Sequence, residues 1–92
     1  MILNELFNTI KGRRTADPEK SYTARLFHQG EDEILKKIGE ESVEVILAAK
    51  GQGDARLVEE IADLSYHILV LLAERGLSLE EVNSELERRS KK

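Results

Sequence analysis

Two short acidic segments hold residues of a type and spacing that could bind a divalent metal ion. They read Glu40-Glu41-Ser42-Val43-Glu44 and Glu60-Ile61-Ala62-Asp63. Each contains two carboxylates three residues apart, and side chains at that spacing share one face of a helix. Asp and Glu account for 18 of the 92 residues, so such pairs also arise by chance and are commonly solvated surface. Spacing alone therefore does not identify a site.

The position of these acids among the apolar residues is more informative. Glu41 falls on an apolar stripe, between Ile38 and Val45, and Glu60 falls on the apolar stripe of the next helical segment. Burying an unpaired carboxylate costs several kcal/mol, so an acid on an inward face needs a compensating partner. A bound cation would supply that compensation.

A tight turn between the two segments would bring the acids together. The sequence Gly51-Gln52-Gly53-Asp54 is a signal to end one helix and begin another. Residues equidistant from the centre of that turn lie at the same height in an antiparallel hairpin. Glu41 then lies opposite Asp63. Glu44 lies opposite Glu60, and both pairs are about 12–17 Å from the turn at a rise of 1.5 Å per residue.

Convergent carboxylates indicate a particular chemistry. They repel one another unless they are protonated or share a cation, and an all-oxygen ligand set selects a hard cation such as Mg²⁺, with Mn²⁺ as the alternative. Protein-bound Mg²⁺ keeps several waters and commonly binds the phosphates of a substrate. The expected reaction is metal-assisted hydrolysis of a phosphoanhydride in a nucleotide.

Helices have to position these residues, and the sequence predicts an all-α fold, a helical hairpin with a shorter helix at each end. The predicted helical stretches are residues 2–12, 22–28, 31–50 and 55–75, and one following Ser78. Asp54 and Ser78 are the expected N-caps of the last two helices, and Glu81 would complete a capping box with Ser78. Residues 13–21 contain the only proline and no apolar periodicity, so they are predicted to form a mobile loop.

Apolar residues at helical spacing are expected to face the core. They are Leu3, Leu6, Phe7 and Ile10 in the first helix, Ile34, Ile38, Val45 and Ala48 before the turn, Leu57, Ile61, Leu64, Ile68, Leu71 and Leu72 after it, and Leu79, Val82 and Leu86 in the last helix. Residues 68–73 are apolar all round, which a helix buried on one side does not require. A second copy is therefore expected to cover the other side, giving a symmetric homodimer with a four-helix-bundle-like core.

Composition narrows the class of protein. A chain of 92 residues suits a single domain over residues 1–92. The net charge of −4 argues against a nucleic-acid partner, which would need a basic surface. The apolar runs are too short to span a membrane, and the first residues do not form a signal peptide. The absence of cysteine fits a reducing compartment, so a cytoplasmic location is expected.

The acidic signature and its flanking blocks resemble those of a known enzyme family. The pattern Glu40-Glu41-x-x-Glu44 followed by Glu60-x-x-Asp63 is similar to the signature of the all-α nucleotide pyrophosphohydrolases, the superfamily of MazG and the dimeric dUTPases. Over nearly all of residues 21–89 the sequence resembles those of the phosphoribosyl-ATP pyrophosphatase branch. The resembling blocks are Ser21-Tyr22-Thr23, Lys37-Ile38-Gly39-Glu40-Glu41, Ala48-Ala49-Lys50, Glu60-x-x-Asp63-Leu64-x-Tyr66-His67 and Val70-Leu71-Leu72.

The resemblance implies an activity and a set of ligands. The activity is Mg²⁺-dependent hydrolysis of the α–β phosphoanhydride of phosphoribosyl-ATP, in histidine biosynthesis, giving phosphoribosyl-AMP and pyrophosphate. The implied metal ligands are Glu41, Glu44, Glu60 and Asp63. Glu40 either joins them or acts on the attacking water, so the catalytic candidates are Glu40, Glu41 and Glu44. Because the fused cyclohydrolase domain found in many organisms uses cysteines, which this chain lacks, the stand-alone form is expected.

Five further residues are candidates for contacts with substrate phosphates: Tyr22, Thr23, Arg25, Lys37 and Lys50. Structural roles would also account for the charged ones. Lys37 can pair with Glu41 one turn later, and Lys50 can interact with the dipole at the end of its helix. Arg25 can be a surface charge, or it can act with the preceding arginine-rich loop to close over a polyanion.

His67 lies one helical turn after Asp63. It can be a core histidine bonded to an acid, or it can be an outer partner that orients Asp63. The spacing is compatible with both roles, and it does not require the histidine to bind the metal.

Two other functions remain open at this point. A general nucleoside-triphosphate pyrophosphohydrolase that cleanses the nucleotide pool would differ only in the pocket for base and sugar. A non-catalytic helical interaction module would carry the acids as surface charge. That module predicts no effect of Mg²⁺ on melting, whereas a metalloenzyme predicts stabilisation by the metal.

Overall fold

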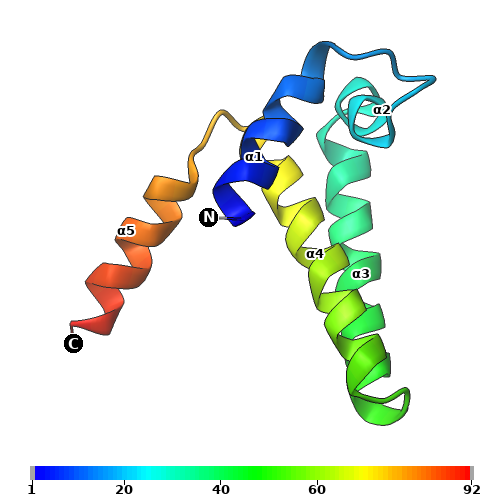
Figure 1. Ribbon diagram of the computed structural model, residues 1–92, viewed down its shortest axis with the longest axis vertical. Helices are drawn as coiled ribbons and strands as arrows, with labels where there is room; N and C mark the ends of the chain where they lie inside the picture. The colour runs from blue at the N-terminus through cyan, green and yellow to red at the C-terminus, as the bar shows by residue number, and fades with distance from the viewer. Residues whose placement is uncertain (1, 92) are drawn as a thin grey trace.

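The computed structural model describes residues 2–91, which form five α-helices and no strand (Figure 1). The elements are α1 (Ile2–Gly12), the 3₁₀ turn η1 (Arg13–Thr15), α2 (Tyr22–Gln29), α3 (Glu31–Gly51), α4 (Asp54–Glu74) and α5 (Leu79–Ser90). The predicted all-α hairpin is confirmed. Met1 and Lys92, which belong to the predicted domain, lie outside the described residues. Within residues 2–91, no helix combines the length and apolar content needed to cross a membrane.

A tight turn joins α3 to α4, and the two helices run antiparallel over their full length (Figure 1). The N–H of Gln52 caps α3 by donating to the carbonyl of Ala48 at 3.0 Å. Gly53 has a φ of +87°, which favours glycine, and it occupies the N-cap position of α4. Asp54 was predicted as that cap, which is wrong by one position. As the first residue of α4, Asp54 still places its negative charge at the end of the helix where the dipole stabilises it.

The hydrophobic core lies at the end of the hairpin away from the turn. There α1 packs on α4, and α2 packs on α3 and α4. The buried core residues are Phe7, Ile10, Leu26, Ile34, Leu69, Val70 and Ala73. The part of the hairpin nearer the turn carries no covering helix in Figure 1. The chain therefore builds its core at one end and leaves the rest of the hairpin accessible.

The predicted inward face is correct for α3 and partly wrong for α1, α4 and α5. The exceptions, all exposed, are Leu3, Ile61, Ile68, Val82 and Leu86. On α4 the buried row runs through Glu60, His67 and Val70 instead. Because α4 is apolar on several faces, its pattern does not define which face the rest of the chain covers. In α5, Leu79 alone among the predicted residues packs against the core.

The segment predicted as a mobile loop, residues 13–21, contains η1 and is tied to the rest of the fold. The Arg14 guanidinium donates to the Ala73 carbonyl at 3.0 Å and lies 4.7 Å from the ring centroid of Phe27. Ser21 caps α2 as its type suggests, accepting from the N–H of Ala24 at 3.1 Å. These contacts anchor the connection between α1 and α2 on the end of α4.

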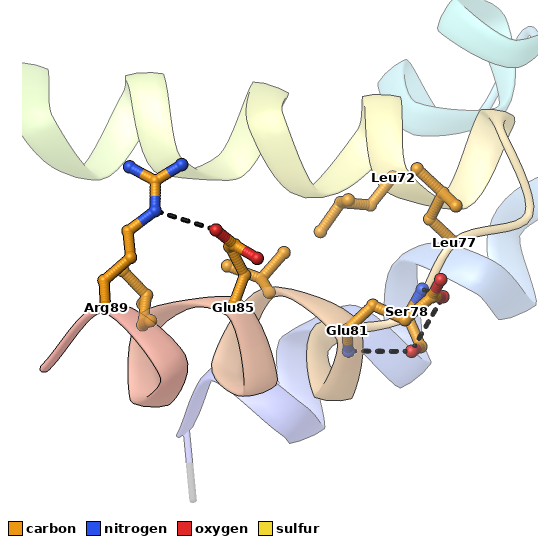
Figure 2. A pocket seen from close by; sticks show the side chains of 8 residues that line it. Leu72, Leu77, Ser78, Glu81, Glu85 and Arg89 are labelled. Carbon is orange, nitrogen blue, oxygen red and sulfur yellow. Dashed lines mark hydrogen bonds and ion pairs between the residues drawn. The ribbon is translucent and has the colours of Figure 1, made fainter. Parts of the chain in front are cut away.

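The last helix stands apart from the hairpin and is held at its start by a capping box (Figures 1 and 2). The Ser78 hydroxyl accepts from the N–H of Glu81 at 3.2 Å, and the Ser78 N–H donates to the Glu81 carboxylate at 2.9 Å. This confirms the capping box predicted from the two residue types. With little tertiary contact, α5 depends on this local arrangement.

Replacing Ser78 with alanine is expected to destabilise α5 by about 1 kcal/mol, because the first turn loses its side-chain acceptor. Far-UV circular dichroism should show a partial loss of helix, while the unfolding midpoint of the hairpin changes little. Ser90→Ala, at the other end of α5, is the control. A cooperative loss of stability of the whole chain would show that α5 is integrated into the core.

Candidate metal centre

Three carboxylates from the two long helices converge on the hairpin. Glu41 of α3 and Glu60 and Asp63 of α4 each offer one oxygen atom, and these atoms lie within 4.8 Å of one another. Glu44 lines the same hollow but does not belong to this tight group. The hairpin register thus brings all four predicted acids to one hollow, three of them within range of a single ion.

The hollow around these acids is open to solvent and has a volume of about 480 Å³. Its lining residues are Lys37, Glu40, Glu41, Glu44, Arg56, Glu60 and Asp63. A volume of this size falls within the range of small-molecule sites. Five acids against two basic side chains leave an excess of negative charge, so the hollow favours a cation.

Glu60 is the buried member of the group, with 2% of its surface exposed. Burial raises the pKa of its carboxyl group, Arg56 opposes that effect, and the neighbouring acids Asp63, Glu41 and Glu44 add to it. A carboxyl group with a raised pKa is one whose charged form is under-stabilised. A divalent cation bound to Glu60 would therefore stabilise its charged form against the effects of burial and of the other acids.

Arg56 is a residue of this hollow that the sequence argument missed. Its Nη2 lies 2.9 Å from Glu60 Oε1, and its Nη1 donates to Glu59 Oε1 at 3.0 Å. The hydrogen bond to Glu59 raises the pKa of Arg56, and the charge of Glu60 adds to it. The signal that could have revealed it is the spacing, because Arg56 precedes Glu60 by one helical turn.

Lys37 lines the edge of the hollow and faces two of the acids. Its Nζ lies 3.4 Å from Glu40 Oε1 and 3.9 Å from Glu41 Oε1, so the predicted ion pair is present. Burial lowers the pKa of Lys37, but the neighbouring Tyr22, the hydrogen bond to Glu40 and the charges of Glu40 and Glu41 outweigh burial, so the pKa is raised overall. The ammonium group therefore stays charged at the edge of the hollow. Glu40 itself is exposed.

His67 connects α2 to the turn of helix that carries Asp63. Its Nδ1 lies 2.8 Å from the main-chain oxygen of Asp63, and its Nε2 lies 2.8 Å from the Tyr22 hydroxyl. A carbonyl oxygen only accepts, so Nδ1 carries the proton and, in the neutral ring, Nε2 accepts from Tyr22. The interpretation of His67 as bonded to an acid side chain is wrong, because its partner is the backbone of Asp63.

The five predicted phosphate contacts divide into two groups. Lys37 lines the hollow, and Tyr22 is near enough to interact with Lys37 and Glu41. Burial raises the pKa of the Tyr22 hydroxyl, Lys37 lowers it, and Tyr66 and Glu41 raise it further.

The other three predicted contacts do not line the hollow. Thr23 is buried and its hydroxyl bonds to that of Tyr66. Arg25 donates to the carbonyl of Pro18 at 3.0 Å, and its guanidinium lies 5.7 Å from the ring centroid of Tyr22. Lys50 lies in the last turn of α3, where its charge complements the helix dipole.

The chemistry of the donor set fits a hard divalent cation. The converging donors are carboxylate oxygens, the ligands that Mg²⁺ and Mn²⁺ prefer. Basic side chains stand beside the acids, so an anionic group could meet both the metal and Lys37. This arrangement can hold a phosphate ester or anhydride, and a water molecule beside it can be activated for hydrolysis.

Comparison with known proteins gives a consistent result. The sequence profile of the phosphoribosyl-ATP pyrophosphohydrolase family matches residues 3–90. A phosphoribosyl-ATP pyrophosphatase of Pelotomaculum thermopropionicum is 57% identical over 91 residues, covering 99% of this chain and 93% of the relative. One of Dechloromonas aromatica is 57% identical over 88 residues, covering 96% and 82%. The histidine biosynthesis bifunctional protein HisIE of Caldanaerobacter subterraneus is 50% identical over 91 residues, which span 44% of that protein.

Proposed function

The chain belongs to the phosphoribosyl-ATP pyrophosphohydrolase family, and we propose that it hydrolyses the α–β phosphoanhydride of phosphoribosyl-ATP to phosphoribosyl-AMP and pyrophosphate. The observation that carries the proposal is the convergence of Glu41, Glu60 and Asp63 on one hollow of the hairpin. The bifunctional relative named for histidine biosynthesis supports a role in that pathway. The proposed substrate is a nucleotide intermediate of amino-acid biosynthesis, and a substrate of this kind supports a cytoplasmic location for the protein.

We propose Mg²⁺, with Mn²⁺ as a substitute, as the metal of the site. Glu41, Glu60 and Asp63 would hold it. When bound, the metal would neutralise phosphate oxygens and lower the pKa of the attacking water. Lys37, held charged beside Glu40 and Glu41, would bind a phosphate oxygen at the edge of the hollow.

Glu44 and Glu40 are the remaining acids of the hollow. Glu44 is partly buried and outside the tight group of oxygens, whereas Glu40 is exposed and paired with Lys37. Glu44 is therefore the better placed to accept a proton from the attacking water without leaving an ion pair. We assign that role to Glu44, and Glu40 then serves to keep Lys37 in position.

The proposed activity is tested by measuring pyrophosphate release from phosphoribosyl-ATP and from ordinary nucleoside triphosphates in the presence of Mg²⁺. We expect a clear preference for phosphoribosyl-ATP. A preference for the triphosphates would instead favour a general pool-cleansing enzyme. Hydrolysis of neither, with the protein folded, would favour a non-catalytic helical module.

We also propose that two copies assemble into a homodimer through the faces that the chain leaves uncovered. Large apolar side chains remain exposed on both long helices, among them Ile46 at 60% and Val58 at 66%. An apolar groove also separates α5 from the end of α4, lined by Leu72, Leu77, Val82 and Leu86 (Figure 2). A second hairpin laid against these surfaces would bury them in a four-helix core.

The dimer predicts a solution mass of twice the 10.4 kDa of one chain at micromolar concentration, measured by sedimentation or light scattering. Ile46→Glu is expected to shift the mass towards the monomer, because it places a charge in the apolar surface. Gln52→Glu adds the same charge at the turn and serves as the control. A monomeric wild-type mass would refute the proposed assembly.

A further inference from the structure

Arg56 lines the hollow and pairs with two acids of its own helix, one of which belongs to the metal centre. Its guanidinium bridges two acids, the buried Glu60 at 2.9 Å and the exposed Glu59 at 3.0 Å. The Arg56 side chain is 49% exposed, that of Glu60 is 3% exposed and that of Glu59 is 65% exposed. Arg56 thus pairs with one buried acid inside the hollow and with one acid that is exposed to solvent.

The contact with Glu60 places Arg56 in competition with a metal ion. Glu60 supplies one of the three oxygens that converge within 4.8 Å, and Arg56 holds an oxygen of that same carboxylate. A guanidinium ion and a divalent cation on one carboxylate repel each other at this range. Metal binding should therefore loosen the contact between Arg56 and Glu60.

Loss of the contact with Glu60 would still leave Arg56 with a partner, because Glu59 already pairs with it. The pair between Arg56 and Glu59 is exposed to solvent, and Glu59 can keep the guanidinium paired after the contact with Glu60 is broken. Arg56 lines the same hollow as Lys37, and a guanidinium fork matches the oxygens of a phosphate group. A displaced guanidinium would therefore still line the hollow, together with Lys37.

We propose that Arg56 is a resident counter-cation of Glu60 that the metal displaces, and that the freed guanidinium then binds the phosphates of the substrate. The second step rests on the proposed function, whereas the first concerns only the protein and the metal. Arg56 thereby changes partner between the metal-free and the loaded site. It would weaken binding of the metal alone and strengthen binding of the phosphorylated substrate.

The first step is tested by titrating the full-length protein with Mn²⁺ alone, by calorimetry or by the electron paramagnetic resonance of free Mn²⁺. Arg56→Gln is expected to tighten Mn²⁺ binding about fivefold, because the metal no longer displaces a cation. Glu59→Gln is expected to weaken it about twofold, since Arg56 loses its second partner. Arg88→Gln, which breaks a similar surface pair with Glu85 on α5, is the control and should not change the affinity.

Unchanged or weaker Mn²⁺ binding in Arg56→Gln would overturn the displacement, and would instead make Arg56 a residue that orients Glu60. For the second step, Arg56→Gln is expected to have a KM for phosphoribosyl-ATP about tenfold higher than that of the wild type at saturating Mg²⁺. Its kcat should stay within about twofold of the wild-type value. An unchanged KM would overturn the phosphate contact. If the wild type does not hydrolyse phosphoribosyl-ATP at all, the proposed function fails while the Mn²⁺ result still decides the displacement.

Discussion

Glu41→Gln should lower kcat/KM for pyrophosphate release by about 1,000-fold while the helical fold remains intact. Glutamine keeps the shape of the side chain but removes the charge of one of the three converging oxygens. Loss of an outer partner of a metal ligand costs about 10–100-fold, and loss of a ligand itself should cost more. A 1,000-fold effect corresponds to about 4 kcal/mol of transition-state stabilisation.

The fold should tolerate this substitution. The Glu41 side chain is only 15% exposed, and its charge repels Glu60, so a neutral side chain relieves that repulsion in the metal-free protein. The control is Asp32→Asn, which removes an exposed acid from the same helix outside the hollow and should keep full activity. Turnover by Glu41→Gln equal to that of the wild type would rule out the proposed centre.

Removal of divalent cations is expected to abolish activity and to lower thermal stability. A ligand that binds only the folded state stabilises it by mass action, by about 2.7 kcal/mol at a hundredfold excess over its dissociation constant. For a domain of this size, each kcal/mol moves the melting temperature by about 4–8 °C. Saturating Mg²⁺ should therefore raise the melting temperature of the chelated protein by about 10 °C or more.

The design of the melting experiment has to separate metal binding from charge screening. Comparison at matched ionic strength with NaCl removes the general effect of salt on an acidic protein. Glu41→Gln should show a much smaller shift with Mg²⁺, because it lacks one converging oxygen. Activity that survives chelation, together with an unchanged melting temperature, would contradict the metal assignment.

The location of the hollow explains how a chain this small can carry a buried acid. The core fills only the end of the hairpin covered by α1 and α2, and the acids lie between that core and the turn. Glu60 is buried there with Arg56 as its neighbour rather than among apolar groups alone. The site thus lies beside the packed end of the hairpin while remaining open to ligands.

The sequence by itself was sufficient to predict the five α-helices and the height of the acids along the hairpin. Helical periodicity and glycine signals depend on local backbone preferences. They therefore predict the first and last residues of the helices to within a few residues. The turn at residues 51–54 then determined the register, because every residue of a helix adds the same rise. For this reason the sequence alone predicts that Glu41 and Asp63 meet.

The tertiary structure alone decided the rotation of α4, the isolation of α5 and the partners of the site residues. α4 is apolar on several faces, so burial of Glu60 and His67 rather than Ile61 and Ile68 depended on where α1 and α2 pack. Arg56 precedes Glu60 by one helical turn, so the spacing permits the pair, but only the structure shows that the pair forms and that Glu60 is buried. The burial of Glu60 and His67 depends on contacts between distant segments, and those contacts are not encoded in the spacing along one helix.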